Sequence, residues 1–459
     1  MERRFLHSVK QQRLFLGGET VLTALSGGPD SVALLGLLRA VAGAFGLRLR
    51  AAHLDHGIRS EAAKDREFVE ELCGLWGVPL DVERIDVPRM ARQRRQGIEE
   101  AARDLRRSYL LRVADEKGCD LIALGHHLDD QAETVLHRLL RGSGPTGLAA
   151  MRPRSGRFIR PLLPFSRWQI LDYLQKKSIV FVEDVSNRDC RYTRNRIRHQ
   201  LLPLLREFNP VIEEQLGRLA EFFAADEDYW GGEIDRLSPQ VGASVAGGWS
   251  IHLPRLRELP VAVQRRLLRG FLERLRGTRP GLSWRQFQAL EKILDSSTPH
   301  AEVALPGCWG GRDYDRLWLF EKRPDFPEPF SLPLHGPGEL LLPGAGRLAA
   351  SLTEDCRGED RWSVEFDADL LPFPLTVRSY RDGDRFQPEG GKGRKKIKEL
   401  FIDLKIPFHQ RRRVPLVATG EILWVAGLRR SALYPVGPKT SRVLRLTFAP
   451  GELWPNLSL

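Results

Sequence analysis

The chain has 459 residues, of which 42% are hydrophobic and 28% charged, and its formal net charge is +12. This length exceeds what one hydrophobic core organises, so we expect a globular protein of two or three domains, and the positive charge favours a polyanionic partner. No apolar run approaches the ~18 residues of a membrane span, and the opening residues lack a signal-peptide pattern, so we expect a cytoplasmic protein without a membrane partner.

The first predicted strand ends at a glycine pair. The apolar run VLTAL at 21–25 is followed by SGGPDS at 26–31 and then by a helix-like run. Gly27 and Gly28 allow positive φ and close backbone approach, and the following helix exposes unpaired N–H groups at the positive end of its dipole. Such a turn is suited to binding phosphate. A Walker loop is excluded because no Lys followed by Ser or Thr comes after the glycines, whereas an ordinary strand-to-helix turn remains the alternative.

Strand-like and helical patterns alternate from Val21 to about Asn209. Further strands are predicted at LRLRAAHLDH, LDVERIDV and DLIALGHH, and the helical pattern beginning at Ile98 lies between the last two. The alternation predicts an α/β fold with a doubly wound, mostly parallel sheet. Ligands of such sheets bind beyond the carboxyl ends of the strands, where the glycine turn and the polar ends of AAHLDHG and ALGHHLDD would meet.

Two further domains are predicted after Asn209 and Pro210. The next hundred residues are mainly helical, with amphipathic segments at VIEEQLGRLAEFFAADEDYW and LPVAVQRRLLRGFLERLRG. The proline-rich stretch EKRPDFPEPFSLPLHGPGE suits a linker, and short β-type runs follow it. We therefore predict an α/β domain at residues 1–210, a mainly helical domain at 211–325 and a small α+β domain at 326–459.

An acidic pair follows the strand DLIALGHH. Asp130 and Glu133 are three residues apart, so their carboxylates lie on one helical face and can converge on a single cation. Asp129, at the predicted helix start, is more simply an N-cap. A solvated acidic surface is the alternative for the pair, but the strand end places it beside the glycine turn.

Six motifs, in this order, are similar to those of the tRNA(Ile)-lysidine synthase family: SGGPDS, HLDHGIR, GHHLDDQAET, RLLRGSGPTGL, NRDCRYTRNRIRHQLLP and RDGDRFQPEGGKGRKKIKELFIDLKIPFHQRRRVPL. The first resembles the PP-loop of ATP pyrophosphatases. The resemblance implies that ATP adenylates the wobble cytidine of the tRNA(Ile) with a CAU anticodon, and that free L-lysine then displaces AMP at C2 to give lysidine, which pairs with A rather than G. It implies ATP and Mg²⁺ as cofactors, a tRNA-binding role for the second domain and acceptor-stem binding for the third, and it allows a homodimer.

The resemblance also implies roles for single residues. Asp130 and Glu133 match lysine-binding positions, Asp30 matches a metal or lysine-side carboxylate, and Arg106 matches an arginine of the same site. The usual Arg-Tyr of the family is replaced here by Arg106 and Arg107, which leaves an ordinary surface arginine as the alternative. N-capping is the alternative for Asp30, and a metal site formed by His53, His56, His126 and His127 is disfavoured because histidines at strand ends also bond loops and nucleotides. The expected nucleotide-binding residues are Ser26, Gly27, Gly28, Asp30, Ser31, His53, Gly125 and His126.

Two basic segments are expected to contact tRNA. One is NRDCRYTRNRIRHQLLP, whose arginines suit phosphates and unpaired bases. The other runs from Thr376 to Arg413, where twelve Lys and Arg stand against five Asp and Glu, so RNA binding should weaken with salt. A merely solvated basic surface is the alternative for both. The candidate contacts are Arg188, Arg194, Asn195, Arg196 and Arg198 in the first segment, and Arg378, Arg385, Lys395, Lys396 and Lys398 in the second.

Two other functions are weighed against this hypothesis. A tRNA thiolase also uses a PP-loop, but it generally needs paired or catalytic cysteines. The five cysteines of this chain are widely spaced and form no Cys-x-x-Cys pair, and only Cys190 lies within a motif. A non-catalytic RNA-binding protein with a nucleotide switch would bind ATP and tRNA without releasing AMP. The intact SGGPDS motif beside Asp130 and Glu133 favours turnover instead.

Overall fold

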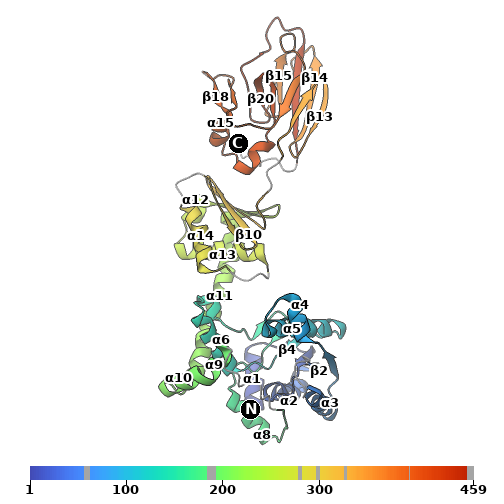
Figure 1. Cartoon of the computed structure of the whole chain (residues 1–459), viewed down its shortest axis with the longest axis vertical. Helices are drawn as coiled ribbons and strands as arrows, with labels where there is room; N and C mark the ends of the chain where they lie inside the picture. Colours follow the sequence, from blue (N-terminus) through green and yellow to red (C-terminus); the bar gives the residue numbers. More distant parts are fainter. Residues whose placement is uncertain are drawn as a thin grey trace. The chain divides into compact units, whose positions relative to one another are not determined.

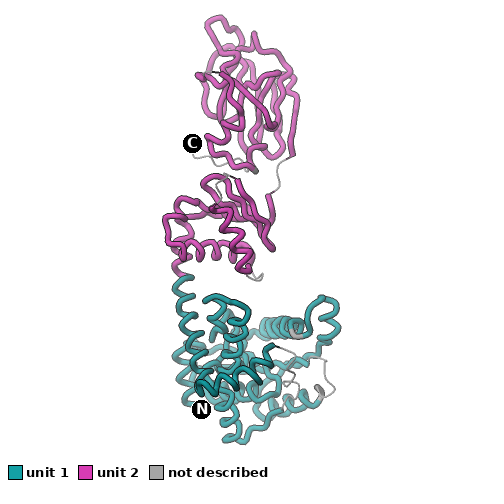
Figure 2. Tube along the Cα trace, turned by 60° about the vertical axis from the view of Figure 1, so that its left-hand side comes forward, with its two compact units in different colours: residues 1–231 teal, residues 232–459 magenta. Residues whose placement is uncertain are grey.

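The computed structural model describes residues 1–55, 62–182, 193–277, 282–295, 300–324, 328–391 and 393–451. The chain divides into two compact units, residues 1–231 and residues 232–459 (Figure 2). No helix in these described ranges has the length and apolar character needed to cross a bilayer.

The first unit is built on a six-stranded sheet. Its strand order is β3-β2-β1-β4-β6-β5, and every neighbouring pair is parallel except β5 with β6. The predicted mostly parallel sheet is thereby confirmed. The strands are β1 (Thr20–Ala24), β2 (Arg48–Asp55), β3 (Leu80–Arg84), β4 (Leu121–Ala123), β5 (Arg154–Ser155) and β6 (Phe158–Ile159).

Helices cover both faces of this sheet. Because successive strand residues point to opposite faces, Val21 of β1 joins one hydrophobic core and Leu22 joins another. The Val21 core holds α2 (Pro29–Phe45) and α8 (Arg167–Lys176), and the Leu22 core holds α5 (Ile98–Glu116), which lies across the sheet from α2 (Figure 1). This is the doubly wound arrangement. The other helices of the unit are α1 (Glu2–Gln11), α3 (Ala62–Trp76), α4 (Val87–Arg94), α6 (Leu128–Leu140), α7 (Pro145–Leu148), α9 (Thr193–Arg196), the π-helix η2 (Ile197–Leu201), α10 (Leu202–Phe208) and α11 (Ile212–Val241).

The second unit begins with helices and an antiparallel sheet. The helix α13 (Val261–Arg276) and the C-terminal part of α11 fall on the predicted helical region, but a five-stranded sheet, β7-β8-β11-β10-β9, accompanies them. Gly310 and Gly311 lie inside one of its strands, where glycine is unusual, and this weakens the strand pattern in the sequence. The other elements are α12 (Leu253–Arg257), α14 (Trp284–Leu294), β7 (Gly242–Val245), β8 (Gly248–His252), β9 (His300–Leu305), β10 (Cys308–Asp313) and β11 (Arg316–Phe320).

The C-terminal part of the second unit contains two antiparallel sheets that share one core. The sheets have the orders β12-β16-β19-β20-β21 and β13-β14-β22-β15, and Trp424 of one packs in the same cluster as Phe366 and Phe448 of the other. A short pair, β17 with β18, precedes α15 (Ile397–Asp403) and the 3-10 helix η3 (Phe408–Arg413). The strands are β12 (Ser331–Leu334), β13 (Gly338–Leu342), β14 (Gly346–Thr353), β15 (Ser363–Asp367), β16 (Leu375–Arg378), β17 (Arg385–Phe386), β18 (Lys395–Lys396), β19 (Leu416–Thr419), β20 (Glu421–Val425), β21 (Arg429–Arg430) and β22 (Val443–Pro450).

Candidate active site

The glycine turn joins β1 to the open N-terminus of α2. Gly27 has φ +87°, which only glycine adopts without strain, and Gly28 occupies the N-cap position without a capping side chain. The Ser31 hydroxyl donates to the Gly28 carbonyl at 2.9 Å and accepts from the Ser26 N–H at 3.1 Å. The turn therefore holds its own shape while the first N–H groups of α2 stay available to an anion, as phosphate binding requires.

Gly125 brings the β4 edge against this turn. Because β4 pairs with β1, the segment after β4 runs beside α2. A Cβ atom at Gly125 would lie 3.2 Å from the backbone C and O atoms of Asp30, which is tighter than nine in ten real Cβ contacts. The role of Gly125 that the structure describes is thus close packing against the start of α2.

His127 connects the glycine turn to the acidic helix α6. Its Nε2 lies 3.7 Å from the Asp30 carboxylate and 3.4 Å from that of Asp130, and its Nδ1 lies 3.4 Å from Asp129. Burial alone would lower the pKa of His127, but these three carboxylates raise it above its ordinary value. The buried His127 ring therefore links the two predicted motifs, and the three carboxylates favour its protonated form.

The three aspartates around His127 differ in their surroundings. Burial raises the pKa of Asp30, and the charges of His127 and Arg167 oppose this only partly. Burial would also raise the pKa of Asp129, but His127 and the Arg167 N–H, which donates at 2.9 Å, lower it to about 2. Asp129 is therefore not the N-cap expected from the sequence: the His127 N–H is bound by Asp130 at 3.1 Å, and Asp129 holds the start of α8 instead.

The acidic pair converges on two arginines. Glu133 and Asp130 are 1% and 8% exposed, and both bind the same two guanidinium groups. Arg194 Nε donates to Glu133 at 2.8 Å and its Nη2 donates to Asp130 at 3.1 Å, while Arg198 Nε bonds Glu133 and its Nη2 donates to Asp130 at 3.0 Å. Burial would raise the pKa of Asp130, but the charges of His127 and Arg194 lower it below its ordinary value. The pair can thus hold a cationic group in a buried position.

Three further predicted residues lie around this pair or behind the turn. Burial lowers the pKa of His126 to about 4, so its imidazole is neutral. Arg106, on α5, is exposed and lies within electrostatic range of Arg194. His53 is buried, with its Nδ1 2.9 Å from the Leu25 carbonyl, so it supports the backbone that leads into the turn. His56 lies outside the described residues.

The donors present fit a magnesium ion that arrives with a phosphate ligand. Asp30 Oδ1 is buried and has no hydrogen-bond partner in the described part of the chain. Mg²⁺ usually takes only one or two protein carboxylates and completes its shell with phosphate and water. The described residues contain no group of three or more His, Cys, Asp or Glu side chains arranged for a metal ion, so a histidine metal site is not seen among them.

The first basic segment is divided between the acidic pair and the surface. Arg194 and Arg198 bind Asp130 and Glu133, as described above, so they are not freely presented to a ligand. Asn195 is partly buried and Arg196 is exposed. Arg188 lies outside the described residues.

The second basic segment also contains both paired and unpaired cations. Arg378 forms a two-bond ion pair with Asp384 at 2.7 and 2.8 Å and is mostly buried, and Lys395 pairs with Asp403. Arg385, Lys396 and Lys398 are exposed and form no ion pair within the described ranges. Of the five predicted contacts in this segment, these three side chains are therefore the ones available to an anionic ligand.

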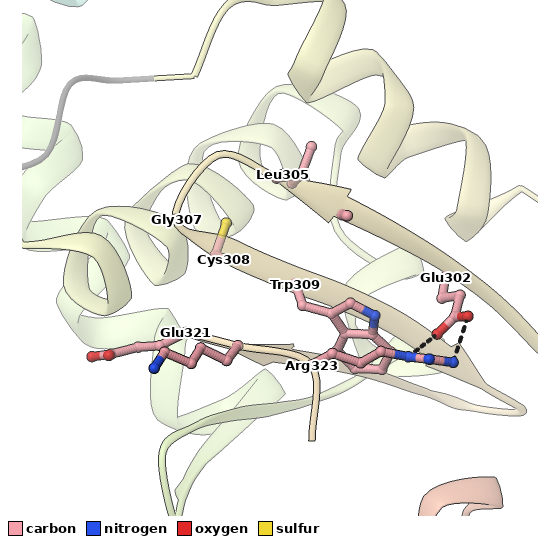
Figure 3. A pocket seen from close by; sticks show the side chains of 9 residues that line it. Glu302, Leu305, Gly307, Cys308, Trp309, Glu321 and Arg323 are labelled. Atoms are coloured by element: carbon pink, nitrogen blue, oxygen red, sulfur yellow. Dashed lines mark hydrogen bonds and ion pairs between the residues drawn. The ribbon is translucent and has the colours of Figure 1, made fainter. Parts of the chain in front are cut away.

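A separate pocket of about 350 Å³ lies on the antiparallel sheet of the second unit. Trp309 forms one wall, and beside it Arg323 binds the Glu302 carboxylate with two hydrogen bonds, of 2.9 and 3.1 Å (Figure 3). None of the predicted site residues lines this pocket, and its charged pair is already satisfied.

Sequence reasoning missed two residues of the site. His127 was considered only as a metal ligand, although it is the group that links the turn to the acidic pair. The doubled histidine of GHHLDD was the available signal, but adjacent residues of an extended segment point in opposite directions, and the sequence does not say which one faces the turn. Arg167, which lies 3.9 Å from Asp30, has no signal in the sequence.

Three family profiles match the chain. They describe a PP-loop domain over residues 1–205, a TilS substrate binding domain over residues 252–318 and a TilS substrate C-terminal domain over residues 375–446. Together they cover parts of both compact units.

Curated relatives match nearly the whole chain. A tRNA(Ile)-lysidine synthase of Geobacter sulfurreducens is 36% identical over 447 residues and is matched over 94% of each chain. A protein of the same name from Solibacter usitatus is 35% identical over 446 residues, which cover 94% of this chain and 99% of that one. Among solved structures, a TilS C-terminal domain is 31% identical and matches 26% of this chain and 98% of its own, with a TM-score of 0.25.

Proposed function

This chain belongs to the tRNA(Ile)-lysidine synthase family, and from its described residues we propose how it carries out that ATP-dependent ligation. Membership rests on relatives at least 35% identical along almost their full length. The activity is tRNA(Ile)-lysidine synthesis, with tRNA(Ile) and lysine as substrates and ATP bound by the PP-loop domain. The assignment of steps to residues is our proposal.

In the first step, the C2 oxygen of the wobble cytidine attacks the α phosphate of ATP and pyrophosphate leaves. The N–H groups at the start of α2 and the turn of Ser26, Gly27 and Gly28 bind the departing phosphates, because this helix end is open and positively polarised. Asp30, whose buried Oδ1 has no hydrogen-bond partner among the described residues, would hold Mg²⁺. When bound, the ion neutralises charge that develops on the pyrophosphate.

In the second step, the ε-amine of lysine attacks C2 and AMP leaves. Asp130 and Glu133 bind the ammonium group, and one of the two carboxylates accepts its proton so that the amine can react. Because these carboxylates are bound by two guanidinium groups in the free protein, lysine must replace one of them. Arg194, whose side chain is 49% exposed, is easier to displace than Arg198 at 25%. An RNA phosphate that draws Arg194 away would open the lysine site only when tRNA is present.

One observation carries this proposal: His127 lies 3.7 Å from Asp30 and 3.4 Å from Asp130. The phosphate turn and the acidic pair therefore border one site, which is the requirement for passing an adenylated base directly to an amine. The short distances and the burial of Asp130 and Glu133 support a binding site rather than a solvated acidic surface.

We assign the tRNA contacts from the positive charge of exposed side chains. Arg196, Arg385, Lys396 and Lys398 are the exposed cations that we assign to tRNA contacts. Arg188 remains a proposed contact from sequence alone. We expect the reaction to take place in the cytoplasm, and a homodimer stays a prediction.

The test is incorporation of labelled lysine by the full-length protein. Unmodified tRNA(Ile) with a CAU anticodon, ATP, Mg²⁺ and labelled lysine are mixed, and label is expected in the tRNA only when ATP is present, with AMP released in equal amount. ATP and tRNA binding without AMP release would instead support a non-catalytic switch. A Cys190→Ser variant should keep full activity, whereas its inactivity would favour sulfur transfer.

A further inference from the structure

Five arginines beside the site have no carboxylate partner in the described part of the chain. Arg103, Arg106 and Arg107 lie on α5 and are exposed, and their spacing of three and four residues puts them on one helical face. Arg138 of α6 and Arg160, which follows β6, lie within electrostatic range of Arg103 on this face. Arg112, on the same helix, binds two carboxylates, whereas these five arginines have none within the described ranges, so the concentration of unpaired charge requires an explanation.

Neutral groups hold three of these arginines in place. The guanidinium carbon of Arg107 lies 4.6 Å from the ring centre of Phe158. Arg138 donates to the Gly147 carbonyl at 2.7 Å, and Arg160 donates to a backbone carbonyl at 2.9 Å. The Arg160 Nε is buried and has no hydrogen-bond partner among the described residues. These three side chains are therefore oriented without their positive charge being neutralised.

The group is electrostatically unfavourable by itself. Burial lowers the pKa of Arg160, and the charges of Arg103 and Arg107 lower it further. Burial and the charge of Arg103 also lower the pKa of Arg138. Like charges that act on one another in this way repel, and a bound anion would reduce this cost.

The arginines extend into the proposed catalytic site. Arg106 lies within electrostatic range of both Arg103 and Arg194, and Arg194 binds the acidic pair. A nucleotide whose base reacts at that pair has its two flanking phosphates on either side of it. The positive groups thus lie where an RNA strand entering the site would carry its backbone.

We propose that Arg103, Arg107, Arg138 and Arg160, the arginine face, bind the tRNA phosphates that flank the reacting nucleotide. The inference rests on the proposed function, since it takes tRNA as the substrate and adds the surface that aligns it. RNA is favoured over an acidic protein segment because planar guanidinium groups bind phosphate in a two-bond geometry, and because the face adjoins the site where the RNA is modified.

The test uses an Arg103→Gln, Arg107→Gln double variant of the full-length protein, which spares the two arginines that bind backbone carbonyls. The dissociation constant for tRNA(Ile) is measured by filter binding at several salt concentrations. We expect binding on the order of tenfold weaker, and a salt slope lower by roughly 0.7 for each phosphate that the variant no longer neutralises. Lysine incorporation should approach the wild-type rate when tRNA is saturating.

Two matched variants keep the outcome interpretable. Arg112→Gln changes the same charge on the same helix, but Arg112 pairs with Glu83 and Glu116, so its tRNA affinity and salt slope should stay at the wild-type values. Arg103→Lys with Arg107→Lys should keep most of the salt slope. An unchanged slope in the double glutamine variant overturns the inference, and so does a parallel loss of ATP binding. Failure of the wild-type protein to incorporate lysine would count against the proposed function instead.

Discussion

Gly125 shows how one missing side chain sets the geometry of the site. The segment after β4 passes so near the first turn of α2 that a methyl group at this position would lie 3.2 Å from backbone atoms of Asp30. Backbone cannot move aside as a flexible side chain can. The distance between the phosphate turn and the residues that follow β4 therefore depends on glycine at this position.

We expect Gly125→Ala to displace the start of α2 and to impair ATP use. Forcing a methyl group into a packed contact costs about 1–3 kcal/mol of unfolding free energy, and ATP-dependent AMP release should fall with it. Gly43→Ala, on α2, is the control, because nothing lies within 4 Å of the Cβ position of Gly43. That variant should be neutral or more stable by up to about 1 kcal/mol. Equal behaviour of the two in thermal unfolding and AMP release would contradict the prediction.

Asp129 predicts a pH dependence of stability. Its native pKa of about 2 lies below the ordinary value of 3.8, so between these values the unfolded chain binds more protons than the native protein. The stabilisation is therefore complete above about pH 4 and is lost as the pH falls through 2. At 1.36 kcal/mol per pKa unit, Asp129→Asn should lower the unfolding free energy at pH 7 by about 2 kcal/mol. The variant should also lose less unfolding free energy than the wild type when the pH falls from 4 to 2. Thermal unfolding of both proteins across this range checks it, and parallel pH profiles would refute it.

The helix α6 presents its acidic side chains to the segment that contains α9 and η2. The i, i+3 spacing predicted that Asp130 and Glu133 share a face, and the two carboxylates do bind the same pair of arginines. The sequence could not indicate that these arginines come from a segment some sixty residues later. Arg198 lies in the π-helix, a geometry often found at functional sites. The contact between the two segments is thus a property of the folded chain.

We expect Glu133→Gln to weaken both lysine binding and the folded state. Loss of the buried charge removes the strongest attraction for an ammonium group, so the KM for lysine should rise by on the order of tenfold or more, while ATP binding is retained. The same change weakens bonds from two arginines, at a cost of about 1.5–3 kcal/mol in unfolding free energy. Glu70→Gln, which breaks the exposed pair with Arg66, is the control and should change stability by less than about 1 kcal/mol. An unaltered KM for lysine would remove Glu133 from the lysine site.

Across the whole molecule, some of the excess basic side chains form ion pairs within the protein, and others are exposed and can bind an anion. Between Thr376 and Arg413, Arg378 and Lys395 are bound by Asp384 and Asp403, whereas Lys396 and Lys398 are exposed and unpaired within the described residues. Counting charges in the sequence could not separate these groups. Only the unpaired cations can release counterions when RNA binds.

We expect Lys396→Gln with Lys398→Gln to lower the salt slope of tRNA binding by roughly 1 for each lysine that binds a phosphate in the wild-type protein. The decrease should be similar for all tRNA sequences, because phosphate contacts carry no sequence information. Lys395→Gln should change the slope much less, because Lys395 already forms an ion pair with Asp403. Equilibrium binding from low to moderate salt measures both. Indistinguishable slopes for the two variants would mean that this surface does not contact RNA.

The sequence by itself determined the family, the parallel α/β sheet and the two motifs that border the site. These features depend on local patterns: alternation of strands and helices, a glycine pair at a strand end, and carboxylates three residues apart. Tertiary structure alone decided that His127 links the motifs, that Asp129 holds α8, that Arg194 and Arg198 bind the acidic pair, and that a sheet lies within the helical middle region. Each of these depends on contacts between distant segments or on glycine inside strands, so local sequence pattern does not reveal them.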